Sequence, residues 1–258
     1  MKTSCISRVL PLVLELALST VYTSEVLAQG VNAGPALNQL SLSFSSGKIV
    51  HRVQLSGSAT WYTGDLEDQG TANLTAFADG SSQMQLTLGT LGQRAESKTG
   101  SGISASCQWT GSNGVAHQID ARNCWKPGVW FLPAISLQPT LLPNSLGIVD
   151  LGTGPVGSSD GAFRHLQSQF VFGELPSNLW ADAAKQSTVD LGLNPTSFLP
   201  AVLAYSVQAD GGSPSAIAIE IHYSDYRLVD GVQVPFLIQR YINGSLQLAI
   251  SVSSAQVG

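Results

Sequence analysis

Charged side chains are scarce in this sequence. Of its 258 residues, 12 are lysine or arginine and 17 are aspartate or glutamate, so 11% are charged and the formal net charge is −5. A protein that holds nucleic acid by its phosphates needs a basic field, which this composition does not supply. The weak acidity is spread along the chain and also argues against docking on an anionic membrane surface. We therefore expect no nucleic-acid partner.

Long apolar segments are also few. Lys2 and Arg8 precede an apolar run over 9–18, and small residues follow up to Ala28. This order predicts a secretory signal over residues 1–28, although a proline and a glutamate interrupt the run and leave a retained N-terminal helix as the alternative. No later segment is long and apolar enough to span a bilayer. We expect a secreted or periplasmic protein, with one domain over 29–258 and no transmembrane segment in the mature chain.

Cysteine is rare, and removal of the signal leaves only Cys107 and Cys124. Between them, apolar residues flank Ser112-Asn113-Gly114, which is the pattern of a hairpin whose arms bring the two sulfurs together. In an oxidising compartment this predicts a disulfide, and the alternative is a pair of buried free thiols. No metal site is expected, because no third and fourth ligand stand at the usual spacing.

The stretch GTGPVGSSDG, residues 152–161, contains two overlapping chemical signatures. A G-x-G-x-x-G dinucleotide turn begins at Gly152, and a G-x-S-x-G hydrolase elbow is centred on Ser159. Both motifs need a helix directly after the turn. An alternating run over 163–172 follows instead, and Pro155 removes a backbone donor. We therefore interpret this stretch as a hairpin loop and predict no catalytic residue and no cofactor.

The remaining candidates for metal binding or catalysis are dispersed. The histidines fall on separate predicted strands without metal-ligand spacing, so polar-face roles are favoured over catalytic ones. The acidic group after Trp61-Tyr62 is interpreted as a solvated hairpin loop in preference to a calcium site. These residues are His51, His117, His165 and His222, and Asp65, Glu67 and Asp68.

Short alternating runs dominate the rest of the chain. They are rich in valine, isoleucine, threonine and aromatic residues and are bounded by glycine, asparagine, aspartate and serine, which predicts a mainly β protein. Helix signals are limited to 35–44, part of 127–142, and 176–186. The predicted strands are 49–62, 71–78, 82–88, 104–110, 115–120, 163–172 and 201–208.

The C-terminal stretch predicts an antiparallel meander with one apolar face. Apolar residues alternate from Ile217 onward, and a two-residue Asp230-Gly231 turn carries the same face into the next strand. A two-residue loop at Asn243-Gly244 would turn the last strand's apolar residues to the wrong side. We therefore predict a three-residue loop, 242–244, that pairs Tyr241 with Ser245.

Residues 223–257, YSDYRLVDGVQVPFLIQRYINGSLQLAISVSSAQV, resemble the C-terminal sheet of bacterial periplasmic proteins similar to LolA, the outer-membrane lipoprotein carrier. The shared order is Asp-Tyr-Arg at 225–227, Val-Asp-Gly at 229–231, Val-Pro-Phe at 234–236, an Asn-Gly turn and a final alternating strand. Upstream, residues 194–200 resemble the turn that opens this half of the sheet. The resemblance covers about the last quarter of the chain.

The resemblance implies an antiparallel curved sheet, an open half-barrel, with a few helices across its concave face and an apolar cavity between them. It implies a non-enzymatic binding protein for a lipid or other hydrophobic ligand, with a lipid or acylated peptide as the expected partner. An envelope interaction or sensor module with a filled core is the alternative, and an enzyme ranks third. Trp130 and Phe131 belong to a proline-broken segment that is either core packing or a lid near the cavity's cover. The face expected to contact ligand comprises Ile219, Ile221, Phe236, Ile238, Leu246, Leu248 and Ile250.

Overall fold

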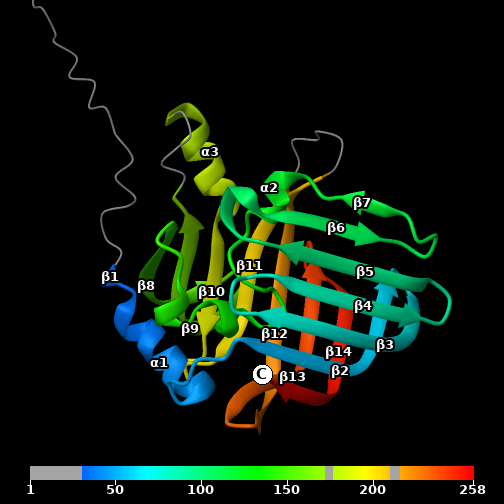
Figure 1. Cartoon of the computed structure of the whole chain (residues 1–258), viewed down its shortest axis with the longest axis horizontal. Coiled ribbons are helices and arrows are strands. Elements are labelled where there is room, and N and C mark those ends of the chain that lie inside the picture. The colour runs from blue at the N-terminus through cyan, green and yellow to red at the C-terminus, as the bar shows by residue number, and fades with distance from the viewer. Residues whose placement is uncertain (1–30, 172–176, 210–215) are drawn as a thin grey trace, which may run out of the picture.

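The computed structural model describes residues 31–171, 177–209 and 216–258 (Figure 1). The predicted signal, Phe172 and Pro176 lie outside the described residues. The described strands form one antiparallel sheet of 14 strands, in the order β1-β8-β9-β10-β11-β12-β13-β14-β2-β3-β4-β5-β6-β7. The two edge strands, β1 and β7, do not pair with each other, so the sheet stays open and the predicted mainly β, antiparallel class is confirmed.

The sheet curls strongly along this order. In Figure 1 the β3–β6 region crosses in front of β11–β14, and both regions contribute residues to the same interior. The strands are β1 (Val31–Asn32), β2 (Arg52–Thr63), β3 (Leu66–Phe77), β4 (Ser82–Leu88), β5 (Gly92–Thr99), β6 (Ser106–Thr110), β7 (Ala116–Gln118), β8 (Leu146–Val156), β9 (Ser159–Phe170), β10 (Val189–Leu193), β11 (Pro200–Gln208), β12 (Ala216–Val229), β13 (Val232–Ile242) and β14 (Ser245–Val257).

Helices are few, and those at 34–45, within 127–142 and at 177–187 lie near the expected positions, whereas the helix at 121–124 was not predicted. The α-helices in the described ranges are α1 (Gly34–Ser45), α2 (Ala121–Cys124) and α3 (Ser177–Ser187). The segment after α2 contains the short 3-10 helices η2 (Pro133–Ser136) and η3 (Pro139–Leu141), as its prolines predict. A further 3-10 turn, η1, spans Gly102–Ser104.

Helix α1 covers one half of the concave face. It starts with proline in its first turn and ends at Ser46, whose left-handed backbone (φ 53°) lets the amide cap Leu42 O. Leu37, Leu40 and Phe44 lie on its buried side and join the main core cluster. The helix contacts β13, η2 and η3, so this half of the sheet is packed solid.

The C-terminal meander confirms the expected faces and corrects the loop. Ile238 pairs with Ile250, and Arg240 pairs with Leu248, so Ile238 and Leu248 share a face as predicted. The three-residue loop is wrong, because Ile242 pairs with Ser245 across a two-residue Asn243-Gly244 turn. Both turn residues have positive φ, 48° and 79°, which suits a twisted hairpin.

The extra residue that restores the register lies within β14, as a β-bulge at Gln247. The register shifts between Arg240 and Tyr241, so Leu246 pairs with Tyr241 and Leu248 with Arg240. Leu246 therefore lies on the opposite face from Leu248, which corrects its assignment to the apolar face. A bulge restores register as well as an odd loop does, and the sequence pattern alone could not distinguish them.

Glycine permits close strand approach where the sheet coils. A Cβ added at Gly70 in β3 would lie 1.9 Å from Thr87 O in β4, and one at Gly57 in β2 would lie 2.1 Å from Ser251 O in β14. Gly57 also faces a register shift in β14, between Val252 and Ser254. These contacts leave no space for any side chain at either position.

We expect Gly70→Ala to destabilise the protein, because its methyl group would strike backbone rather than a mobile side chain. The expected loss is about 1–3 kcal/mol, the range for overpacked sites, measured from urea unfolding midpoints. Gly154→Ala in β8 is the matched control, since a Cβ there meets nothing within 4 Å. Equal stability of the two variants would contradict the steric account of the curl.

Candidate ligand-binding site

A cavity of about 520 Å³ lies on the concave side, in the half that α1 leaves uncovered. Its walls are the inner faces of β4–β6 on one side and of β10–β13 on the other, closed by the segment from α2 to Phe131. This volume lies within the range of small-molecule sites in proteins. The curled sheet thus brings strands from opposite ends of the chain around one space.

Most of the cavity wall is apolar. Its side chains come from both sides of the curl, and several are buried residues of the main core cluster. Such a wall favours the hydrocarbon part of a ligand, because apolar surface gains free energy on leaving water. The main apolar lining residues are Met84, Phe131, Val189, Leu203, Val207, Ile217, Ile219 and Ile242.

The structure separates the residues that the sequence assigned to one ligand-contacting face. Ile219, Trp130 and Phe131 line the cavity. Leu246 points to the other face of the sheet, as the register requires. The remaining residues lie in the core cluster that α1 and η2 also join, away from the cavity: Ile221, Phe236, Ile238, Leu248 and Ile250.

The segment after α2 is firmly held against the core. Phe131 and Ile135 are completely buried. The Gln138 amide donates to Val50 O at 2.7 Å and accepts from Val50 N at 2.8 Å, so it joins this segment to the start of β2. Of the two expected roles, core packing describes Phe131 and the residues after it. Trp130 lies at the cavity, where its backbone oxygen accepts a hydrogen bond from the Tyr223 hydroxyl.

The predicted disulfide between Cys107 and Cys124 is present, with the two Cα atoms 5.7 Å apart. Cys124 lies on α2 rather than on the second arm of the β6–β7 hairpin, so the bond ties α2 to β6. Both cysteines line the cavity. The bond therefore helps to set the width of the cavity at this end.

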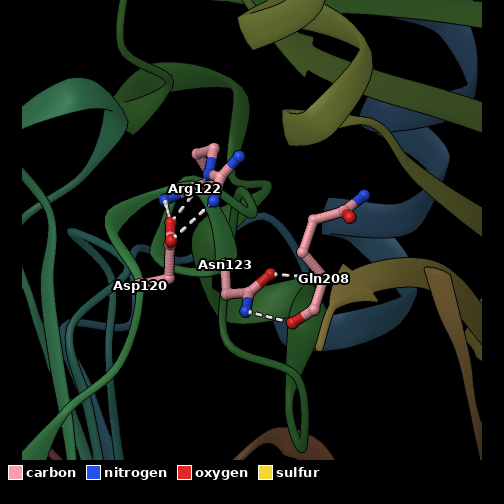
Figure 2. Close-up of polar contacts among 4 residues, drawn as sticks. All are labelled: Asp120, Arg122, Asn123 and Gln208. Atoms are coloured by element: carbon pink, nitrogen blue, oxygen red, sulfur yellow. Dashed lines mark hydrogen bonds and ion pairs between the residues drawn. The ribbon is translucent and has the colours of Figure 1, made fainter. Parts of the chain in front are cut away.

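A second tie holds α2 to the opposite wall. Figure 2 shows the Asn123 amide pointing toward the backbone of Gln208, at the end of β11. Asn123 Nδ2 donates to Gln208 O at 2.9 Å, and Gln208 N donates to Asn123 Oδ1 at 2.8 Å. Asp120 caps the start of α2 and pairs with Arg122 (Figure 2). Helix α2 thus bridges β6 and β11, which are distant in the strand order.

Reduction of the disulfide should lower stability, because it releases the chain entropy that the cross-link removes from the unfolded state. For a sequence separation of 17 residues, the expected loss is about 3 kcal/mol. Urea unfolding of the Cys107→Ser/Cys124→Ser variant measures it. A single Cys107→Ser variant also lacks the bond but keeps Cys124, so it separates loss of the bond from the effect of the second serine. An unfolding midpoint that is unchanged in both variants would contradict a stabilising role for the disulfide.

Charged side chains line the cavity in a pattern that the sequence analysis missed. Strand β5 presents Arg94, Glu96 and Lys98 at alternate positions, on the same face. This strand was not predicted, because its inward residues are charged rather than apolar. The period-two spacing of the three charges was the available signal.

Burial changes the acid–base properties of the two lysines at the cavity. Desolvation lowers the pKa of Lys98 to about 8, although the Asp79 carboxylate opposes this shift. Desolvation also lowers the pKa of Lys126 to about 8. Lys98 Nζ donates to the backbone oxygens of Lys126 and Gly128. Both amines remain mainly protonated at neutral pH.

The 152–161 stretch forms the end of the β8–β9 hairpin, as the sequence predicts. Val156 pairs with Ser159, and no helix follows. Ser159 nevertheless meets Glu220 and His222: its Oγ donates to Glu220 Oε1 at 2.7 Å and lies 3.4 Å from His222 Nε2. The same His222 nitrogen contacts Glu220 Oε1 at 2.6 Å. A catalytic histidine uses separate nitrogens for serine and acid, so this group is a polar cluster without triad geometry.

The polar cluster at Glu220 makes stability depend on pH. Burial raises the pKa of Glu220, but hydrogen bonds from Ser159, His222 and Ser158 outweigh it and lower the pKa to about 2. A carboxylate with a lowered pKa stabilises the fold above its unfolded pKa, and that contribution is lost as the pH falls from about 4.5 toward 2.

Glu220→Gln should therefore be less stable than the parent protein at pH 7, and the difference should shrink toward pH 2. Thermal midpoints at pH 7, 4 and 2.5 measure this dependence. Glu67→Gln, at an exposed position of β3, is the control. A difference that stays constant over this range would show that the ionised carboxylate is not the cause.

Three other candidates for metal binding or catalysis contact neighbouring residues of the fold. His165 contacts Asp190 at 2.8 Å, and His117 stacks on Trp109. The Asp68 carboxylate accepts from the Thr90 and Leu91 amides beside a tight turn. Within residues 31–171, 177–209 and 216–258, no three His, Cys, Asp or Glu side chains gather as a metal site.

No helix within residues 31–171, 177–209 and 216–258 has the length and apolar character to cross a bilayer.

No protein-family model matches the sequence, and no curated protein matches it. Solved structures match its fold. An outer-membrane lipoprotein-sorting protein domain from Vibrio parahaemolyticus superposes with a TM-score of 0.52 at 8% identity, over 88% of this chain and 93% of that one. A LolA superfamily protein from Nitrosomonas europaea gives 0.51 at 11% identity, over 88% and 94%.

A third similar structure is a DUF1329 family protein from Desulfovibrio piger. Its TM-score is 0.52 at 9% identity, and the match covers 87% of this chain and 92% of that one. Similarity at these identities concerns the backbone arrangement and carries no site residues across. It agrees with the resemblance found in the C-terminal strands, and the chain therefore has a LolA-like fold.

Proposed function

We propose that this protein is a secreted or periplasmic, non-enzymatic binding protein, with residues 29–258 as a single LolA-like domain that holds a lipid or an acylated peptide. The observation that carries the proposal is the cavity of about 520 Å³ between the two walls of the curled sheet. The oxidised Cys107–Cys124 pair suits an oxidising compartment. The similar structures from Vibrio and Nitrosomonas are described as lipoprotein-sorting and LolA superfamily proteins.

The energetics of the cavity favour a hydrocarbon ligand. Each methylene that leaves water contributes about 0.8 kcal/mol. Ten buried methylenes would thus contribute on the order of 8 kcal/mol, before the cost of ordering the ligand. A dissociation constant of 1 μM corresponds to about 8.2 kcal/mol, so the free energy that remains after this cost gives an affinity weaker than micromolar, which suits a carrier that must also release its ligand.

Ile217→Trp should weaken binding of a neutral apolar probe by about tenfold or more, because the larger side chain fills space that the ligand needs. Ile217 lines the cavity and is half-buried. The measurement is fluorescence titration of delipidated protein with N-phenyl-1-naphthylamine. Leu228→Trp, at a position 67% exposed on the same strand, is the matched control and should bind as the parent does.

The filled-core alternative has one specific observation in its favour, which is the solid packing of the other half of the concave face beneath α1. An envelope interaction module would need no cavity ligand. If delipidated protein binds neither the probe nor palmitate up to millimolar concentration, the binding function is wrong and the interaction module remains. Native mass spectrometry of protein purified from its own envelope provides an independent check, since a carrier should retain lipid.

A further inference from the structure

Positive charge is concentrated at the cavity. Four of the chain's 12 lysines and arginines line it, Arg94, Lys98, Lys126 and Arg240, whereas Glu96 is the one acidic side chain among the lining residues of the described chain. The whole chain has a net charge of −5. The cavity therefore has the opposite charge sign from the protein that contains it.

Among the described residues, Arg240 is the one cation of the cavity that forms an ion pair. Arg240 is mostly buried, and its Nη1 lies 3.2 Å from both carboxylate oxygens of Glu96, while its Nε donates to Gln247. The arginine also lies over the rings of Trp61 and Trp130. Arg240 and Glu96 thus form an internal pair that joins β13 to β5 across the cavity.

Arg94 has no such partner in the part of the chain that the structure describes. Its guanidinium carbon lies 4.8 Å from the centroid of the Trp61 ring. Its Nε is buried, and no acceptor among the described residues lies within hydrogen-bonding distance. A buried donor without an acceptor is unfavourable, so a group that supplies an acceptor here would bind favourably.

The lysines extend the positive row along the same wall. Lys98 lies four residues after Arg94 on the same face of β5, about 13 Å further along the strand. Backbone oxygens of Lys126 and Gly128 hold the Lys98 amine in place, but these acceptors are neutral. Neither lysine forms an ion pair among the described residues.

We propose that the cavity binds a single-chain anionic amphiphile, whose carboxylate or phosphate head group is attracted by the combined positive charge of Arg94, Lys98 and Lys126 and whose alkyl chain lies along the apolar wall. This proposal rests on the binding function above and specifies its ligand class. Tyr205 lines the same space, and burial raises its pKa to about 12, so its hydroxyl remains available as a donor to the head group.

The two halves of the ligand are each required by a different part of the site. A free inorganic anion would leave the apolar wall unused, and a neutral lipid would leave Arg94 and Lys126 without a counter-charge from the described residues. Charge-assisted hydrogen bonds in a partly desolvated cavity are stronger than neutral ones. An anionic amphiphile satisfies both demands at once.

Isothermal titration of delipidated protein with ligands of equal chain length tests the proposal. The set is palmitate, 1-palmitoyl lysophosphatidic acid and neutral 1-monopalmitoylglycerol, all kept below their aggregation concentrations, together with inorganic phosphate alone. We expect at least one anionic ligand to bind about tenfold or more tightly than the neutral one, about 1.4 kcal/mol. Inorganic phosphate should not bind measurably.

Charge-removing variants locate the head group. Arg94→Gln and Lys126→Gln should each weaken anionic binding by about tenfold and change monopalmitoylglycerol binding by less than about twofold. Arg52→Gln and Lys48→Gln, at exposed positions, are the matched controls and should leave both affinities unchanged. A thermal midpoint for each variant verifies that the fold is intact.

Three outcomes overturn the proposal. Equal affinity for the anionic and neutral ligands would show that the charges do not select the head group, and the binding function would survive. Equal loss of both affinities in Arg94→Gln or Lys126→Gln would assign those side chains to the shape of the cavity. Binding of inorganic phosphate with no binding of any lipid would remove both this proposal and the binding function.

Discussion

The shape of this protein depends on one constraint, which is that the apolar concave face of a long curled sheet must be covered. Helix α1 and the η2 segment cover only the half formed by the meander, where Leu40, Phe44 and Ile135 fill the space. The other half is closed by strands β4–β6 folding back toward β10–β13. The cavity lies between these two walls.

Contacts across the curl hold the two walls in place. The disulfide joins α2 to β6, the Asn123 amide joins α2 to β11, and the Arg240–Glu96 pair joins β13 to β5. Through α2, the first two contacts together connect β6 to β11, and the third connects β13 to β5; the strands of each pair are far apart in the sheet order.

The same topology explains why the chemical motif at 152–161 does not form an active site. Its serine meets a glutamate and a histidine from β12, but it sits at a β-hairpin end, and one histidine nitrogen faces both partners. A catalytic elbow depends on a sharp strand-to-helix turn that exposes the serine Oγ at the top of a sheet. Proximity of the three residue types is therefore insufficient, and the low pKa of Glu220 reflects a hydrogen-bonded structural carboxylate.

Period-two alternation, turn glycines, cysteine number and proline positions act locally, so the sequence predicted the mainly β class, the meander's inward residues other than Leu246, the disulfide partners and the short helices within 127–142. It did not distinguish a bulge at Gln247 from a longer loop, since both restore the same register. The sequence also could not show which residues of the apolar face line the cavity and which are packed in the core. Ile219 and Ile221 are equivalent in pattern, yet one lines the cavity and the other is completely buried in the core. This division depends on the curl of the sheet, which determines where α1 packs and where β5, with its charges, closes the opposite wall.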